Sequence, residues 1–245
     1  MSISGSRVNI AQFWGMGRKI VAVGRNYAEH ALELGNAVPA QPLLFLKPTS
    51  SYVLEPNPIE LPLGAGEVHH EVELGIVISK RGRDIKETEA MDFVGGYALA
   101  LDLTCRDLQA EAKKKGTPWT VAKGYDTFCP ISPFIPKSAL PSAATNTTLW
   151  LKVDGIERQR GNTNQMIFSV PTLIQYISSI MTLDVGDLIL TGTPSGVGPL
   201  KAGQVVTAGV EGILEMRFPV VNRKAASAES VGDQAASPTK ERARL

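Results

Sequence analysis

Two segments of alternating apolar residues, 70–78 and 96–104, constrain the fold most, because each carries acidic side chains inside what otherwise reads as a buried strand. Side chains two positions apart on a strand point to the same face, so Glu71 and Glu73 share one face and the large apolar residues share the other. In the second segment, Asp102 lies opposite the bulky residues, among small neighbours that leave room for a ligand. The pattern predicts strands whose three carboxylates could converge on one site.

These three carboxylates predict a metal site. A carboxylate removed from water without a partner loses several kcal/mol, so buried acids are ordinarily ion-paired, protonated or bound to a cation. Residues two apart on a strand lie roughly 6.6 to 7 Å apart at Cα, and two glutamates can close that span on one ion with metal–oxygen distances of about 2.1 Å. Three oxygen donors without a cysteine in the set suit Mg²⁺ or Mn²⁺ better than zinc, and they leave about three octahedral positions open. The alternative is that Glu71 and Glu73 only line the polar face of an exposed antiparallel strand.

Composition favours an enzyme or binding protein for small molecules. The 245 residues suffice for one large domain with a substantial core, and 25 basic against 24 acidic residues show no excess charge for binding nucleic acid. Cys105 and Cys129 are too few for a disulfide framework and lack the spacing of a zinc or redox motif. No apolar run approaches the roughly 18 to 20 residues of a membrane span, so we expect a soluble protein that does not bind membranes.

The two ends of the chain differ in character from the region between them. Residues 1–18 form an N-terminal segment that we interpret as a weak targeting sequence or a lead-in strand, since residues before Glu29 include four basic side chains and no acid. This pattern resembles a mitochondrial presequence, and we expect a mitochondrial location, with the cytosol as a second one. Residues 19–222 should form the catalytic domain, and residues 223–245, which lack aromatic residues and an apolar period, should form a disordered tail.

Short segments separated by Gly and Pro predict a mixed α+β fold that is predominantly β, with a few short helices. We expect strands over residues 20–23, 43–45, 72–79, 96–103, 149–153, 188–190, 204–210 and 212–220.

Three helices are predicted from caps and periodicity. The first spans residues 27–34, with Asn26 as N-cap and Gly35 as its end, and the second spans 106–115 and ends at Gly116. We expect the lysine run at positions 113–115 of the second helix to face water. The third follows Ser169 and Pro171 and carries an apolar stripe for packing on the sheet, made of Leu173, Ile174, Ile177, Ile180 and Met181.

Several polar residues are candidates for chemistry beside the metal. His30 has Glu33 one helical turn away, and a carboxylate there could hold the ring in one tautomer and raise its basicity toward that of a general base. A surface ion pair explains the same spacing equally well. Lys123 follows an apolar stretch, so its ammonium should face an anion, and Arg106 and Gln109 could donate to a carboxylate or keto oxygen or be ordinary helix residues.

The glycine-rich segment 191–198 follows a predicted strand and supplies backbone N–H groups and hydroxyls. Such groups could hold a substrate carboxylate, whereas an ordinary turn between strands would have a similar composition. The segment lacks the Gly-x-x-x-x-Gly-Lys-Ser/Thr pattern of a P-loop.

Taken together, motifs along residues 15–222 resemble the fumarylacetoacetate hydrolase family, and in particular its short, single-domain members. The motifs, in order, are Val23-Gly24-Arg25-Asn26-Tyr27-Ala28-Glu29-His30, Leu44-Phe45-Leu46-Lys47-Pro48, His70-Glu71-Val72-Glu73-Leu74-Gly75, Gly95-Gly96-Tyr97, Asp102, Lys123-Gly124 and Thr191-Gly192-Thr193-Pro194.

The resemblance implies roles for individual residues. It places the metal ligands at Glu71, Glu73 and Asp102. It implies His30, Glu33 and Lys123 as catalytic residues, and substrate contacts at Arg25, Arg106, Gln109 and Thr193. It also implies a mixed β-roll or sandwich fold, Mg²⁺ or Mn²⁺ as cofactor and a homodimer.

The implied activity is that of an enzyme acting on small 2-oxo acids through a metal-stabilised enolate. Oxaloacetate decarboxylation, its keto–enol tautomerisation and hydrolytic cleavage of acylpyruvates such as acetylpyruvate and fumarylpyruvate all pass through that species. The alternatives are an isomerase or decarboxylase of aromatic-degradation dioates, a dedicated fumarylpyruvate hydrolase, or a catalytically silent metal-binding scaffold.

Overall fold

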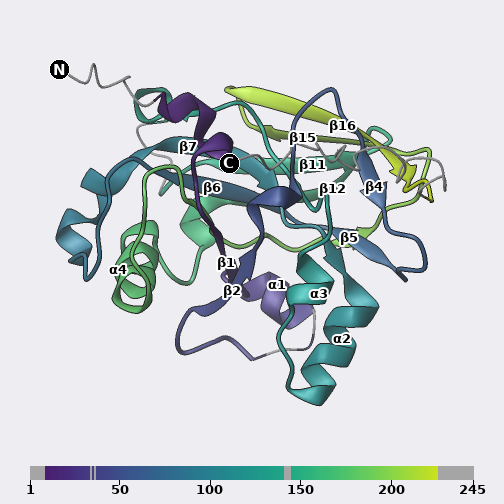
Figure 1. Ribbon diagram of the computed structural model, residues 1–245, viewed down its shortest axis with the longest axis horizontal. Coiled ribbons are helices and arrows are strands. Elements are labelled where there is room, and N and C mark those ends of the chain that lie inside the picture. Colours follow the sequence, from purple (N-terminus) through teal and green to yellow (C-terminus); the bar gives the residue numbers. More distant parts are fainter. Residues whose placement is uncertain (1–8, 34, 36, 141–144, 226–245) are drawn as a thin grey trace, which may run out of the picture.

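A computed structural model describes residues 9–33, 35, 37–140 and 145–225, and it is built mainly of β-structure (Figure 1). The larger sheet contains, in spatial order, β10 (Ile135–Pro136), β7 (Val94–Leu101), β6 (Val72–Ile78), β13 (Leu188–Leu190), β1 (Ile20–Gly24) and β2 (Leu43–Lys47). The second contains β12 (Ile156–Asn162), β11 (Thr148–Val153), β15 (Val205–Val210), β16 (Leu214–Asn222) and β4 (Ile59–Leu61).

Two small sheets complete the β-structure of the described residues. One joins β14 (Gly198–Pro199), β5 (Val68–His70) and β8 (Thr104–Cys105), and the other joins β3 (Tyr52–Val53) and β9 (Cys129–Pro130). The sheets are mixed, because β1 pairs with β13 in parallel while β6 pairs antiparallel with both β7 and β13. The predicted α+β fold dominated by strands is thus confirmed.

The helices are few and short. The α-helices are α1 (Ala28–Glu33), α2 (Arg106–Lys115), α3 (Thr120–Lys123) and α4 (Val170–Ile180), and the 3-10 helices are η1 (Ile10–Gly15), η2 (Thr49–Ser51), η3 (Glu87–Phe93), η4 (Lys137–Ala139) and η5 (Thr163–Gln165). Figure 1 shows α1, α2 and α3 gathered below the sheets, away from β15 and β16. This cluster of helices lies beside the ends of the strands that carry the acids.

All eight predicted strands exist, with ends that differ by a few residues. Among the described strands, the prediction missed seven of two or three residues each, β3, β4, β5, β8, β9, β10 and β14. It also missed the longer β12, whose side chains are mostly exposed and polar because it is an edge strand of the second sheet. Such a strand has no apolar alternation for a pattern to detect. The turn Asp154-Gly155, where both residues have positive φ, is the signal that could have found this hairpin.

Two of the three predicted helices have the expected caps. Helix α2 ends at Gly116, which adopts the left-handed conformation with φ of 67°, and the Ser169 side chain accepts from the N–H of Thr172 at the start of α4. One member of the α4 stripe was predicted wrongly, since Ile180 is 57% exposed at the end of the helix.

Asn26 does not act as the predicted N-cap of α1. Its amide donates to the carbonyl oxygens of Phe168 and Thr191, and its side-chain oxygen accepts from the N–H of Phe168. The buried side chain therefore fixes the chain between β1 and α1 against two distant segments, which local capping rules do not anticipate.

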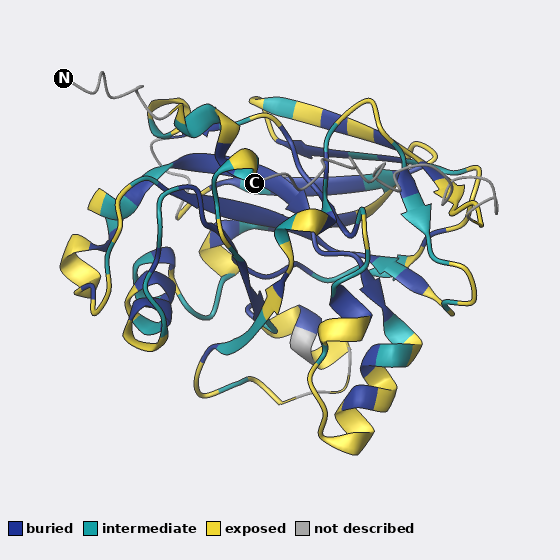
Figure 2. Cartoon of the chain, in the orientation of Figure 1, coloured by how far each residue is buried: buried dark blue, intermediate teal, exposed yellow. Residues whose placement is uncertain are grey.

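Apolar side chains cover both faces of the larger sheet. The even-numbered residues of β6 and the bulky residues of β7 belong to one cluster with β11, β15, β16 and α4, whereas Val77, Ala98 and Ala100 belong to a second cluster with Phe13. Figure 2 shows β6 and β7 as the most continuously buried part of the molecule. The predicted division of faces in both strands is confirmed, and the acids of these strands lie on the side of the second cluster.

The segment before β1 is not the lead-in strand considered above, because residues 10–15 form the 3-10 helix η1. Phe13 of this helix is fully buried and packs edge-on against Trp14 and Tyr52. Residues 1–8 of the predicted N-terminal segment 1–18 and residues 226–245 of the predicted tail 223–245 lie outside the described residues. Among the residues that are described, no helix combines the length and apolarity needed to cross a bilayer.

Phe13→Ala is expected to lower the free energy of unfolding by about 3–5 kcal/mol, because it removes a fully buried aromatic ring and leaves a cavity. Chemical denaturation followed by circular dichroism measures this. Leu63→Ala, at a side chain that is 62% exposed, is the control and should change stability by less than about 0.5 kcal/mol. Equal, small effects of both substitutions would show that η1 does not pack on the domain as described.

Candidate metal and active site

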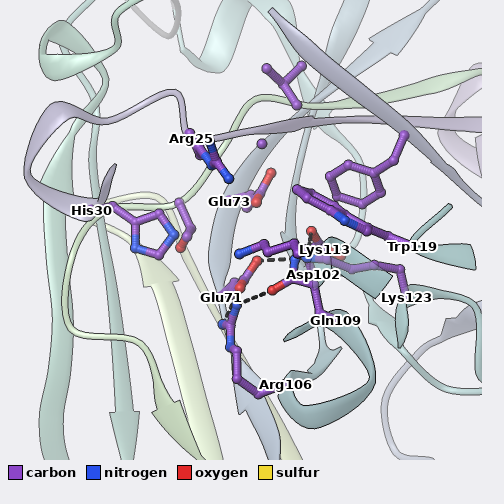
Figure 3. Close-up of a pocket in the computed structure, with 14 residues that line it drawn as sticks. Arg25, His30, Glu71, Glu73, Asp102, Arg106, Gln109, Lys113, Trp119 and Lys123 are labelled. Carbon is purple, nitrogen blue, oxygen red and sulfur yellow. Dashed lines mark hydrogen bonds and ion pairs between the residues drawn. The ribbon is translucent and has the colours of Figure 1, made fainter. Parts of the chain in front are cut away.

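The pairing of β6 with β7 brings the three acids together. Val72 lies opposite Leu101 and Glu73 opposite Ala100, and beyond these pairs the N–H of Asp102 donates to the carbonyl oxygen of Glu71 at 2.8 Å. Each of the three acids offers a carboxylate oxygen within 4.8 Å of the others, and all three residues are buried (Figure 3). The small side chain of Ala100 leaves space between the glutamates and the neighbouring strand.

Lys123 and Arg106 contact these carboxylates directly. Lys123 Nζ donates to Glu71 Oε2 at 2.9 Å and to Asp102 Oδ2 at 2.5 Å, and Arg106 donates to Glu71 Oε1 at 2.5 Å. Burial alone would raise the pKa of Glu71, but Lys123 and Arg106 outweigh it and hold that pKa well below its ordinary range. The expectation that Lys123 faces an anion therefore agrees with its contacts, and Glu71 is an ionised carboxylate.

Lys47 is a further buried cation at the site, and we assigned it no role from the sequence. Its Nζ lies 2.8 Å from Asp102 Oδ1 and donates to the carbonyl oxygens of Leu103 and Lys123. Asp102 Oδ1 is buried but accepts no hydrogen bond from the described part of the chain, so one of its oxygens has capacity for another partner. The signals in the sequence were a lysine at the end of an apolar strand immediately before Pro48 and its place in one of the motifs that carry the family resemblance.

Glu73 lacks a cationic partner among the described residues. One of its oxygens accepts from the N–H of Gly192 at 2.7 Å, and burial together with the charges of Asp102 and Glu71 raises its pKa well above the ordinary range. A divalent cation between the carboxylates would remove this repulsion. The oxygen-only donor set, the free capacity of Asp102 Oδ1 and the uncompensated Glu73 all fit Mg²⁺ or Mn²⁺.

The glycine-rich segment 191–198, which follows β13, donates hydrogen bonds to acidic side chains of the protein itself. Its backbone N–H groups are therefore not all available to a substrate. Gly192, whose φ is +96°, packs against Asn26 so closely that a Cβ would lie 2.7 Å from that side chain, and its N–H is the one that holds Glu73. The Thr193 hydroxyl donates to the Val72 carbonyl oxygen. The N–H of Gly196 donates to both oxygens of Glu33. Two backbone donors that we expected for a substrate carboxylate thus serve the protein's own carboxylates.

Gln159 is another residue that the sequence gave no reason to select. Its amide nitrogen donates to the Thr193 hydroxyl and the Pro194 carbonyl oxygen, and its oxygen accepts from the N–H of Val72 and contacts His70 Nδ1. It joins the edge strand β12 to the strand that carries Glu73 and to the loop at Thr193. Its buried side chain therefore holds these three segments in fixed positions relative to one another.

His30 and Glu33 form the predicted pair at one wall of the pocket. Nδ1 of the buried His30 lies 3.3 Å from Glu33 Oε2, and Glu33 itself is partly exposed and held by Gly196. If Nδ1 carries the proton that Glu33 accepts, Nε2 is the unprotonated nitrogen available to take a proton from water. Of the ten predicted site residues, Glu33 does not line the pocket, while the other nine do.

Five wall residues were not predicted as site residues, namely Val23, Gly24, Phe45, Lys113 and Trp119. All three lysines of the run are exposed, as expected, but Lys113 also lines the pocket, whereas Lys114 and Lys115 do not. On another wall of the pocket, Arg106 donates to Gln109 Oε1 at 2.8 Å. Arg25 also lines the pocket, and its backbone φ is 60°. A φ in this region is uncommon outside glycine, and it turns the chain where the arginine enters the pocket.

The chain matches known proteins over most of its length. Residues 19–221 match the family model described as fumarylacetoacetate (FAA) hydrolase C-terminal. The mitochondrial oxaloacetate decarboxylase of Dictyostelium discoideum is 64% identical over 215 residues, covering 87% of this chain and 98% of that protein. The mitochondrial oxaloacetate tautomerase FAHD1 of Arabidopsis thaliana is 59% identical over 214 residues, covering 87% and 96%.

A solved structure has the same fold and contains a metal. The fumarylpyruvate hydrolase of Pseudomonas aeruginosa, in complex with Mn²⁺ and pyruvate, superposes with a TM-score of 0.79 at 37% identity, covering 84% of this chain and 91% of that one. With the family model spanning both main sheets and every predicted metal ligand, the chain belongs to the fumarylacetoacetate hydrolase family.

Proposed function

We propose that this protein is a mitochondrial, divalent-metal-dependent enzyme that acts on 2-oxo acids, decarboxylating and tautomerising oxaloacetate and hydrolysing acylpyruvates to pyruvate and a carboxylic acid. The observation that carries the proposal is the cluster of Glu71, Glu73 and Asp102, buried at a pocket that four lysine and arginine side chains also line. The names of the two relatives support oxaloacetate as substrate and the mitochondrion as location.

The metal proposed for the three acids is Mg²⁺, with Mn²⁺ as the alternative found in the fumarylpyruvate hydrolase. When bound, such an ion supplies Lewis-acid polarisation of a 2-oxo group. Lys123 and Arg106 hold Glu71 ionised and in place, and Gly192 orients Glu73 through its N–H. We propose that Gln109, Thr193 and Arg25 contact the substrate, and that two copies of the chain form a homodimer.

Two of the three reactions, decarboxylation and acylpyruvate hydrolysis, break the bond between C3 and C4. In decarboxylation this bond breaks as CO₂ leaves, and the electron pair passes to C3 and the C2 oxygen, after which C3 is protonated to give pyruvate. In acylpyruvate hydrolysis, His30 takes a proton from water as the water attacks the C4 carbonyl, and the same bond breaks when the adduct collapses. Tautomerisation requires only that a proton leaves C3 while the C2 oxygen gains one, or the reverse. Glu33 stabilises the charge that His30 acquires.

A fumarylpyruvate hydrolase is the second candidate, and one observation favours it. The solved relative of that activity shares the fold at 37% identity and contains pyruvate, which is the product expected from acylpyruvate cleavage. Both candidates need a base for water, and the His30–Glu33 pair in the pocket provides one. The same pair argues against a silent metal-binding scaffold.

A side-by-side assay tests the proposal. The purified protein with Mg²⁺ is given keto-oxaloacetate, enol-oxaloacetate and acetylpyruvate, while ultraviolet absorbance follows the enol and a coupled assay measures pyruvate. We expect turnover of all three, abolished by a chelator and restored by Mg²⁺ or Mn²⁺. Mg²⁺ without protein is the control, because metal ions alone promote oxaloacetate decarboxylation. Tight Mg²⁺ binding without turnover of any of these acids would instead identify a scaffold.

A further inference from the structure

The cations around the pocket fall into two groups. Lys47, Arg106 and Lys123 each lie in ion-pair contact with Asp102 or Glu71. Arg25 and Lys113 line the same pocket, yet within the described part of the chain neither forms an ion pair. The first group is engaged by Asp102 and Glu71, so the second group is the one available to a ligand.

The position of Lys113 distinguishes it from its neighbours in the lysine run. Its ammonium lies 5.5 Å from the ring centroid of Trp119, and that ring packs at 5.4 Å on Phe45, which also lines the pocket. Burial first, and then the charges of Arg25 and Arg106, lower the pKa of Lys113. Arg25, Arg106 and Lys113 lie close enough together at the pocket for their positive charges to repel one another. A bound anion would relieve this repulsion. Figure 3 shows Arg25, Lys113 and Trp119 around one pocket.

A simpler explanation places Lys113 at the C-terminal turn of α2 only to complement the helix dipole. Lys114 and Lys115 occupy the same turn and serve that purpose equally well, and Lys115 also pairs with Glu111. Dipole complementation therefore does not account for the one lysine of the three that lines the pocket beside a tryptophan.

The charge of the substrate follows from this arrangement. A divalent cation bound to the three acids would bring two positive charges, and Arg25 and Lys113 bring one each. These positive charges exceed what one carboxylate of a 2-oxo acid can neutralise. An acylpyruvate with an uncharged acyl group would leave these side chains without a partner, whereas a second carboxylate at the other end of the substrate would pair with them.

We propose that Lys113, together with Arg25, binds the substrate carboxylate that is remote from the 2-oxo group, and thereby makes this enzyme select 2-oxo dicarboxylates over acylpyruvates with an uncharged tail. This inference rests on the proposed function. Lys113 is thus a specificity-determining residue whose contribution is to substrate binding, and Trp119 orients its side chain.

Steady-state kinetics with oxaloacetate and acetylpyruvate test the proposal on the magnesium-loaded protein. We expect Lys113→Met to raise KM for oxaloacetate by about tenfold or more, with kcat little changed, because a charge-assisted contact is lost. KM for acetylpyruvate should change by less than about threefold. Lys113→Arg should recover most of the loss, and Lys114→Met, the same substitution at an adjacent lysine that does not line the pocket, should alter KM for neither substrate.

A binding measurement separates this inference from catalysis. Calorimetry compares oxamate with N-oxalylglycine, which have the same oxalyl group but differ in the remote carboxylate. We expect the unaltered protein to prefer N-oxalylglycine and Lys113→Met to lose that preference while retaining its affinity for oxamate.

Two failures remain distinguishable. If the unaltered protein turns over no 2-oxo acid, the proposed function fails, and the calorimetry still reports on Lys113. If the unaltered protein is active but Lys113→Met changes both substrates equally, or neither, the role of Lys113 is overturned and the proposed function stands.

Discussion

Asp102→Asn is expected to lower turnover of both oxaloacetate and acetylpyruvate by at least about 100-fold, because it replaces one of three anionic carboxylate ligands by a neutral amide and leaves Lys47 and Lys123 facing one negative charge fewer. The loss should appear first as loss of metal. Titration with Mn²⁺, followed by electron paramagnetic resonance of the free ion, measures affinity without turnover, and we expect it to fall by a similar factor.

Loss of a buried charge also destabilises a protein, so the control variant must lose a buried charge at a position away from the metal site. Asp187 is fully buried, pairs with Lys19 and accepts from the N–H groups of Arg18 and Asp184, but it does not belong to the metal cluster. Asp187→Asn should lower the melting temperature and leave Mn²⁺ affinity unchanged in the folded protein. Normal Mn²⁺ binding by Asp102→Asn, or equal loss of binding in both variants, would contradict the assignment of the ion to Asp102.

His30→Ala is expected to reduce acylpyruvate hydrolysis by about 10² to 10⁴-fold while reducing oxaloacetate decarboxylation by less than about tenfold. Hydrolysis needs an activated water, and the buried imidazole beside Glu33 is the group placed to generate it. Decarboxylation breaks the same bond without water. The measurement is kcat for each substrate, made on metal-loaded protein.

Two further variants sharpen this result. Glu33→Gln keeps the size of the side chain but removes the charge that stabilises a protonated His30, so it should reduce hydrolysis in the same direction by a smaller factor. His69→Ala replaces a histidine that contacts Glu67 and does not line the pocket, and both activities should persist. Equal loss of hydrolysis and decarboxylation in His30→Ala would show that the pair does not divide the two reactions.

The alternation of residues was sufficient to place Glu71 and Glu73 on one face and Asp102 among small neighbours. On a strand, the face to which a side chain points depends only on its place in the alternation of residues. This face can therefore be predicted from the local sequence. Caps behaved similarly at Gly116 and Ser169, where the relevant contacts lie within one turn of helix. Asn26 failed as a cap because its partners lie 142 and 165 residues away.

The same contrast holds at the active site. The sequence by itself determined the donor chemistry, three hard oxygen ligands on β-structure with a histidine and a glutamate one helical turn apart. Only the tertiary structure decided that Asp102 lies across from Glu71, that Lys47 and Lys123 neutralise it, and that Lys113 alone of its run reaches the pocket. The physical reason is that a side chain's direction depends on local backbone dihedrals, whereas its partners depend on sheet register and on chain segments that meet only when the core is packed.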